Sequence, residues 1–222
     1  MICFEQFHHT HELFLNEECL NIYINQLKKN KMKKTIATLL ISLSIFATKA
    51  QTWTLDNSHS SVNFAITHMV VSETAGNFKK FSADVTATKA DFTDLKVNFT
   101  IETASVNTDN EKRDEHLRGD DFFNAPKYPA ITFTSTKTVL KGNNLTLTGN
   151  LTMHGKTKAV TFTGKYNGTI KDPYGLNRAG FKLKTVLKRS DFDLTWNKTL
   201  DQGGLALGDE VTVTVNIEVT KK

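Results

Sequence analysis

From residue 51 onward, apolar and polar residues alternate one by one along most of the chain. Val62, Phe64 and Ile66 share one parity, with polar or small residues between them. The same alternation recurs over residues 97–102, 131–134, 145–153, 160–162, 181–183 and 211–219. Because successive side chains of a strand point to opposite faces, the pattern predicts strands with one buried and one solvated face.

Turn-forming residues separate these runs. Gly142–Asn144 and His154–Lys156 each fall between two apolar runs closely enough to form a hairpin. Asp172–Gly175 predicts a third turn, in which Pro173 presets the backbone. One stretch departs from the period: Thr108–Arg118 carries charges at helical spacing and predicts a short helix near Asn110–Leu117.

The number and length of the runs bear on the architecture. Short turns between consecutive runs favour an all-β antiparallel meander over alternating strands and helices. About eight strands are expected, several of them long, and closure into a barrel removes the exposed edges that a flat sheet or sandwich would leave. We therefore expect one domain, residues 51–222, folded as a single eight-stranded antiparallel β-barrel with one short helix.

Many of the inward positions are aromatic. An eight-stranded barrel has an interior just wide enough to pack itself with side chains or to hold one small ligand. A phenylalanine lining favours an apolar guest, but a solid aromatic core produces the same pattern, so both alternatives stay open on the pattern alone. The candidate lining residues are Phe64, Ile66, Phe81, Phe99, Ile101, Phe133, Phe162, Phe181, Leu183 and Phe192.

The residues before the barrel have the pattern of a targeting segment. Met32–Lys34 supplies a basic start, Thr35–Phe46 an apolar core, and Ala47–Ala50 small residues at the −3 and −1 positions. Residues 32–50 are therefore predicted to be a signal peptide that is cleaved after Ala50. The apolar core is about 12 residues long, short of the roughly 20 that span a membrane. We expect a periplasmic or secreted protein.

Residues 1–31 precede this signal peptide, which should itself begin the protein. The simplest interpretation is a start codon assigned too early, with Met32 as the true initiator and residues 1–31 as an upstream extension. Both cysteines, Cys3 and Cys19, lie in that extension. The mature chain is therefore expected to contain no disulfide and no cysteine-based metal site.

Charge and motifs narrow the function. Of 28 Lys and Arg residues six lie within residues 1–50, which leaves the barrel only slightly basic and argues against a nucleic acid partner. The spacing of His59, His68, His116 and His154 matches no zinc site, so these histidines are expected in turns and on the surface. No nucleophile or phosphate-loop motif occurs. We expect no catalytic residue, no metal and no enzyme activity.

Two charged segments receive structural interpretations. The helical stretch Arg113–Arg118 is predicted to be solvated and to cap one end of the barrel, although an acid–base cluster is the alternative. Arg189, beside Asp191, is expected to order the loop before Phe192.

Short blocks along the chain occur in an order typical of one protein family. They are Trp53–Asp56, His59–Ser60, Gly76, Phe78, Phe81, Arg113–Asp114, His116–Arg118, Asp121–Phe123, Tyr128–Pro129, Ile131–Phe133, Leu147–Gly149, Leu151–Thr152, His154–Gly155, Thr157–Lys158, Arg189–Phe192 and Gly208–Val211. The mature sequence resembles the YceI-like family of lipocalin-like barrels over nearly all of residues 51–222. Asp193 departs from the pattern, because the family usually has glycine there.

The resemblance implies an apolar tunnel that accepts an isoprenoid tail, with a polyisoprenoid-type lipid as ligand and no cofactor. A periplasmic structural or stress protein with a solid core is the alternative, and a lipid-modifying enzyme is a third. The outward parity carries Thr, Lys and Asn rather than an apolar band, so no stable membrane insertion is expected. Whether the chain forms a homodimer stays open.

Overall fold

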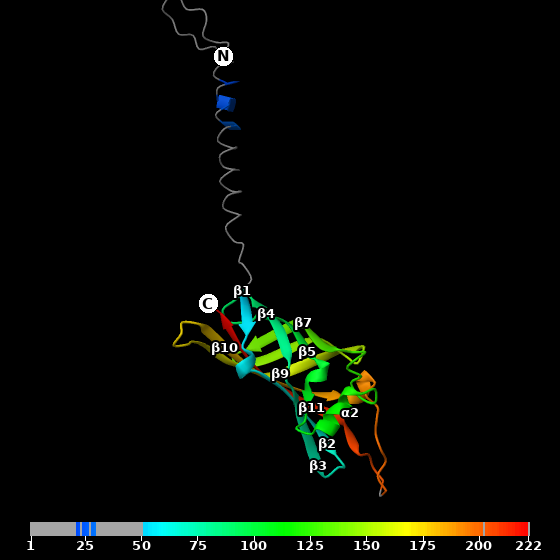
Figure 1. Cartoon of the computed structure of the whole chain (residues 1–222). Helices are drawn as coiled ribbons and strands as arrows, with labels where there is room; N and C mark the ends of the chain where they lie inside the picture. The colour runs from blue at the N-terminus through cyan, green and yellow to red at the C-terminus, as the bar shows by residue number, and fades with distance from the viewer. Residues whose placement is uncertain (1–20, 23, 27, 30–50, 202, 222) are drawn as a thin grey trace, which may run out of the picture. The chain divides into compact units, whose positions relative to one another are not determined.

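The structure is a computed structural model that describes residues 21–22, 24–26, 28–29, 51–201 and 203–221. Residues 1–48 separate from residues 49–222 as a distinct unit, and the positions described in the first unit are helical. The predicted signal peptide and its cleavage site lie outside the described residues, as does most of the predicted upstream extension. The description below concerns the second unit (Figure 1).

Eleven strands form one antiparallel sheet. They are β1 (Gln51–Leu55), β2 (Ser61–His68), β3 (Ser72–Phe78), β4 (Phe81–Ala87), β5 (Lys96–Glu102), β6 (Val106–Asn107), β7 (Ala130–Lys141), β8 (Asn144–Met153), β9 (Lys156–Lys171), β10 (Asn177–Lys188) and β11 (Leu207–Lys221). The ring β1-β4-β5-β7-β8-β9-β10-β11 closes through a pairing of β1 with β11. The predicted eight-stranded antiparallel barrel is confirmed.

The three remaining strands continue strands of the ring. β1 pairs with the end of β11, and β2 pairs with β11 from its start at Leu207 to Asn216. The 3₁₀ helix η1 (Asn57–His59) separates β1 from β2. β3 leads into β4 across Lys79 and Lys80, and β5 into β6 across η2 (Thr103–Ser105). The segment between β3 and β4 is hydrogen-bonded to the segment between β5 and β6, since the Lys79 N–H donates to the Ser105 carbonyl at 3.0 Å. The strand pairs β1–β2, β3–β4 and β5–β6 therefore each form one bent line. In these lines β2, β3 and β6 extend the wall of the barrel beyond the ring.

The turns follow from the residues that occupy them. Gly142 has a φ of 55°, and His154 and Gly155 have φ of 51° and 76°, so two tight hairpins use the left-handed backbone that glycine favours. The expected helix is α2 (Glu111–Arg118), and its N-cap Asn110 accepts a hydrogen bond from the Arg113 N–H at 3.1 Å. Hairpins and helix are both confirmed.

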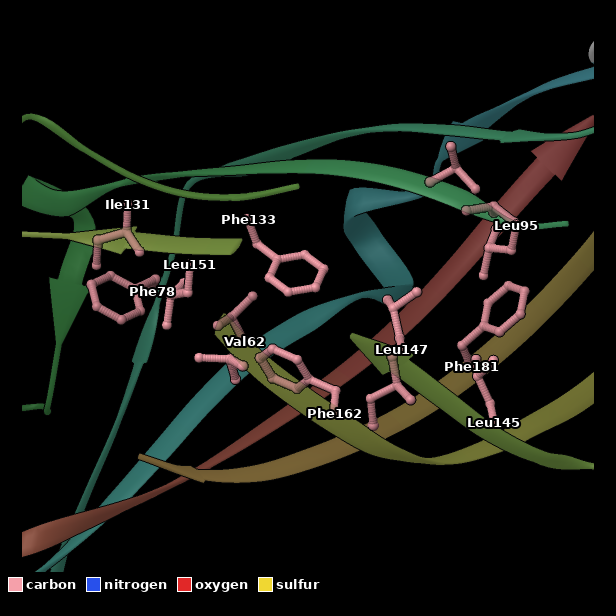
Figure 2. Close-up of a cluster of buried hydrophobic side chains, with 14 of the residues drawn as sticks. Val62, Phe78, Leu95, Ile131, Phe133, Leu145, Leu147, Leu151, Phe162 and Phe181 are labelled. Atoms are coloured by element: carbon pink, nitrogen blue, oxygen red, sulfur yellow. The ribbon is translucent and has the colours of Figure 1, made fainter. Parts of the chain in front are cut away.

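The alternation sorts the side chains as predicted. Phe133, Phe162 and Phe181 point into the barrel from three different strands (Figure 2), and the rings of Phe133 and Phe162 meet edge to face at 5.3 Å. Their strand neighbours Thr161 and Lys182 are exposed. The core is therefore built from one parity of each strand.

The barrel has two unlike ends. The seam end contains β1, the start of β10 and the end of β11 (Figure 1). The helix end contains α2, the β2–β3 hairpin and residues 189–201 and 203–207. At the seam end Phe92 is fully buried, with the rings of Trp53, Tyr166 and Phe181 at 5.0, 5.3 and 5.2 Å. This aromatic cluster plugs the seam end.

Candidate functional site

An inner cavity of about 130 Å³ lies within the barrel. Apart from Asn63, its lining side chains are apolar. Seven of the predicted residues line it: Phe64, Phe99, Ile101, Phe133, Phe162, Phe181 and Leu183. The cavity can accommodate an apolar group and offers almost no hydrogen-bond partner to a polar one.

A second cavity of about 280 Å³ lies at the helix end and is called the helix-end cavity. The predicted residue Ile66 lines it, together with aromatic side chains that include Phe122, Phe123 and Trp196. Its lining also contains polar side chains: His68, Thr74, Thr108, Arg113, His116 and Arg189. This cavity therefore combines an apolar wall with groups that can bind something polar.

The two cavities share part of their walls. The shared residues are Phe64, Phe78, Met153, Leu187 and Val213. Gly76 stands directly across from Phe64 in the β2–β3 pair, and a Cβ at Gly76 would lie 2.4 Å from the Phe64 ring. Because glycine leaves room for that ring, it helps to set the position of the boundary between the cavities.

Two of the ten predicted residues line neither cavity. Phe81 is half-buried beside the β3–β4 bend, where it stacks on Phe99 at 5.6 Å. Phe192 is fully buried, but it belongs to the 3₁₀ helix η3 (Arg189–Phe192), where the alternation of β10 has ended. Whether the other eight bind a ligand remains a prediction.

The interpretation of α2 as a solvated cap was wrong in part. Asp114 is buried, and Arg113, His116 and Leu117 line the helix-end cavity. These three residues follow the i, i+3, i+4 spacing of one helix face, a signal present in the sequence. The His116 ring packs edge to face on Phe122 and Trp196 at 4.9 and 5.1 Å, so this histidine is not merely a surface group.

Arg113 is held by a neutral residue. Its Nε donates to the Thr108 hydroxyl at 2.7 Å and its Nη2 to the Thr108 carbonyl at 2.8 Å. The same hydroxyl donates to the buried Asp114 carboxylate, which also accepts from the Thr108 N–H at 2.8 Å. Thr108 therefore stands between the guanidinium and the acid and fixes the orientation of both.

Arg189 does order its loop, as expected, but through backbone carbonyls rather than through Asp191, which is exposed. Its guanidinium donates to the carbonyl oxygens of Gly208 and Trp196, both at 2.9 Å, and to that of Leu194. Burial lowers the pKa of Arg189 from its ordinary value. The side chain holds the loop of residues 194–196 against the start of β11.

The seam end contains a different arrangement of charges. Arg178 donates to Asp56 at 2.8 Å, to Asp172 at 2.7 Å and to Glu218 at 2.5 Å. Hydrogen bonds from His59 and then Arg178 lower the pKa of Asp56 from 3.8 to about 2. Asp56, His59 and Glu218 place ligand atoms within 4.8 Å of one another, but Arg178 already supplies the positive charge that a metal ion would bring.

Comparison with known proteins places this barrel in a family. The YceI-like domain matches residues 53–219. The chain belongs to the YceI-like family. The YceI protein of Salmonella newport (strain SL254) is 40% identical over 169 residues, which are 76% of this chain and 88% of the relative.

Two solved structures have the same fold. Burkholderia cenocepacia BcnA is 28% identical with a TM-score of 0.64, over 74% of this chain and 98% of BcnA. A Saccharophagus degradans domain, described as polyisoprenoid binding and implicated in plant cell wall breakdown, is 16% identical with a TM-score of 0.54. That match covers 77% of this chain and 98% of the domain, and it shows the fold alone.

The departure at Asp193 from the YceI-like pattern has a local explanation. Asp193 is in the left-handed conformation, with φ 57° and ψ 24°, where glycine has no steric cost. Aspartate tolerates this conformation better than most residues, and its carboxylate pairs with Lys156 at 2.9 Å. The turn is kept despite the larger side chain.

Among the helices in the part of the chain that the structure describes, none is both long and apolar enough to cross a membrane.

Proposed function

We propose that the mature chain, residues 51–222, is exported and binds a long polyisoprenoid-type lipid inside the barrel, for carriage, storage or a stress response. The observation that carries the proposal is the apolar inner cavity and its shared wall with the helix-end cavity. The polyisoprenoid-binding domain of Saccharophagus degradans, which shares the fold, supports this choice of ligand. A single chain encloses both cavities, so the proposed binding needs no second copy.

The physical basis is removal of apolar surface from water, which contributes about 25 cal/mol per Å². Ligand pockets usually measure about 300–1,000 Å³. Neither cavity alone reaches that range, whereas the two joined do. Met153 and Leu187 lie on the shared boundary, and the flexible methionine can change rotamer at little cost. A long tail would therefore displace these side chains and occupy both cavities.

A structural or stress protein with a solid core is the second candidate. It is favoured by the size of the inner cavity, about 130 Å³. An engineered apolar cavity of about 150 Å³ holds no more than a benzene-sized group. Catalysis is not part of the proposal, because the described residues that line the two cavities include no Ser, Cys, Asp or Glu.

Organic extraction of the mature protein purified from its native host, followed by mass spectrometry, tests the proposal. We expect a prenyl lipid in the extract and an intact protein mass that begins at Gln51. An empty extract, combined with no uptake from a mixed panel of isoprenoids, would favour the solid core. A protein mass that includes residues 1–31 would show that the start and the export route were misread.

A further inference from the structure

Apolar side chains gather on the surface at the helix end. Met69, Val70 and Val71 form the turn between β2 and β3, and they are 45%, 76% and 86% exposed. Leu205, which is 54% exposed, lies close by, because the Met69 N–H donates to the carbonyl of the next residue, Ala206, at 2.8 Å. These four exposed residues are called the apolar tip. The β2–β3 hairpin and the loop that contains Leu205 extend past α2, at the end away from β1 (Figure 1).

The turn at the apolar tip has a backbone shape that its residues do not favour. Met69 and Val70 have positive φ angles of 51° and 64°, and the Val71 N–H donates to the His68 carbonyl at 3.2 Å. A hairpin turn of this shape prefers Asn-Gly, and a positive φ is exceptional for a β-branched residue. The turn between β8 and β9 also has two successive positive φ angles, and there the second residue is glycine, Gly155. At the tip, apolar side chains are thus present against the local preference of the backbone.

The apolar tip is not part of the core of the barrel. None of its four side chains belongs to the buried apolar cluster or to the half-buried residues that pack against that cluster. Three consecutive exposed apolar residues are unfavourable in water, and such surface usually marks a site of contact with another molecule or with a membrane. The apolar character of the tip therefore serves a contact outside the barrel.

We propose that the apolar tip enters the headgroup layer of a lipid bilayer and holds the helix end against it, so that the barrel takes up and releases its lipid at the membrane. This role rests on the proposed function, because a polyisoprenoid-type lipid dissolves in a bilayer and only poorly in water. His68 and Leu207, which pair with each other at the base of the tip, line the helix-end cavity. The tip therefore brings the cavity close to the bilayer. The contact is peripheral, since only turns enter the headgroup layer.

The size of the tip favours a bilayer over a protein partner. A specific protein interface involves about 20–30 residues on each side, whereas the tip offers four side chains. A bilayer requires no matching shape, and the contact strengthens with the apolar area that leaves water. The charged residues within four positions of the tip in the sequence, Glu73, Asp201 and Asp209, are all acidic. Attraction to anionic lipids therefore does not drive the contact.

Flotation of mature protein with vesicles of pure phosphatidylcholine tests this role. One double variant, Met69→Asn with Val70→Gly, gives the turn its preferred sequence, and a second, Val70→Ser with Val71→Ser, keeps the methionine. The matched control is Ile170→Ser with Tyr174→Ser, because these side chains are 66% and 88% exposed on the β9–β10 hairpin at the seam end. Thermal unfolding of every variant is measured alongside.

We expect both tip variants to bind vesicles at least about tenfold more weakly than the wild-type protein, because burial of even one valine side chain is worth about that factor. The control should bind as the wild type does. The Asn-Gly variant should unfold at the wild-type temperature or above it, since the new residues suit the turn. Neither salt nor added anionic lipid should strengthen the binding.

Four results would overturn the bilayer contact. The first is an absence of wild-type flotation, or equal flotation of the tip variants. The second is an Asn-Gly variant that unfolds well below the wild type, because the apolar side chains would then stabilise the fold itself. The third is binding that requires anionic lipid and disappears at high salt, which would place the contact on basic residues elsewhere. The fourth is a wild-type dimer that the tip variants lose, without vesicle binding, which would assign the tip to a second copy of the chain.

Uptake of a prenol from two sources separates this contact from the proposed function. From vesicles, the tip variants should take up the prenol several times more slowly than the wild type; from a soluble cyclodextrin complex, all should take it up alike. Wild-type uptake from cyclodextrin without flotation would overturn the role of the tip and leave lipid binding in place. Failure of the wild type to take up prenol from either source would overturn the proposed function, even if the protein floats with vesicles.

Discussion

The two ends of the barrel use arginine in opposite ways. Arg178 lies at the start of β10 and Arg189 directly follows the end of that strand, so β10 connects the seam end with the helix end. At the seam end Arg178 contacts three carboxylates. At the helix end Arg189 and Arg113 are held by carbonyls and a hydroxyl. The charge of Arg178 is therefore neutralised by direct contact with acids, whereas Arg113 and Arg189 bond directly to neutral groups among the described residues.

The two ends also differ in packing: aromatic side chains fill the seam end, whereas those at the helix end border a cavity. At the seam end Phe92 is fully buried and its ring packs edge to face on Phe181. At the helix end the rings of His116, Phe122 and Trp196 contact one another and still border a cavity of about 280 Å³. A buried aromatic cluster at one end and a cavity at the other is the arrangement expected of a barrel that a ligand would enter from one end.

The largest effect should come from truncating the plug. Phe92→Ala should cost roughly 3–5 kcal/mol of unfolding free energy, the usual penalty for a well-packed phenylalanine. Phe162→Ala and Phe99→Ala should cost less, since these rings already border the inner cavity, but they should weaken retention of a prenyl lipid. Urea unfolding with and without added prenol measures both. Full penalties at Phe99 and Phe162, with no lipid uptake by the wild-type protein, would mean a solid barrel.

A smaller effect is expected at the boundary between the cavities. Gly76→Ala places a methyl group 2.4 Å from the Phe64 ring and 2.8 Å from Thr108, so the ring must move. Such overpacking typically costs about 1–3 kcal/mol, and lipid uptake should fall with it. Gly180→Ala is the control, because its methyl would meet Asn167 at an ordinary 3.6 Å. Equal behaviour of the two variants would contradict the role given to Gly76.

The smallest effect concerns the paired charges of the seam end. Because the folded-state pKa of Asp56 is lowered from 3.8 to about 2, its contribution to stability is complete above pH 3.8 and is lost as the pH falls toward 2. For this partly solvated group the contribution is on the order of 1 kcal/mol. Asp56→Asn should flatten the fall of unfolding free energy over that range, and Asp120→Asn at the other end should not. Identical slopes in both variants would refute this account.

The sequence predicted the barrel better than it predicted the cavities. Alternation revealed the inward face of each long strand, and it placed Phe133, Phe162 and Phe181 correctly on that face. Phe81 and Phe192 are packed against or within the core but line neither cavity, since one lies next to a bend and the other beyond the end of a strand. The alternation of apolar and polar residues does not reveal where a strand bends or ends.

The helix-end cavity was largely missed for a related reason. Its walls come from α2, from five strands (β2, β3, β8, β10 and β11) and from the loops that contain Phe122 and Trp196, which are brought together only by the closed barrel. His68, Arg113 and Trp196 lie far apart in the sequence, and no single period links them. Only the face of α2 gave a local signal, and its charges favoured a solvated helix instead. Sites made of irregular segments depend on tertiary structure for their recognition.

The closing pairing of the barrel has a consequence for the order of events in folding. Leu55, near the start of the domain, pairs with Val219, near its end, and β2 also pairs with β11. The ring therefore cannot shut until nearly the whole domain has been synthesised, and contacts of such large sequence separation make folding slow. Until then β1 and β2 have no β11 with which to pair. Slow closure leaves the chain unfolded for longer, which would suit the export proposed above, since a polypeptide crosses a narrow export channel in an unfolded state.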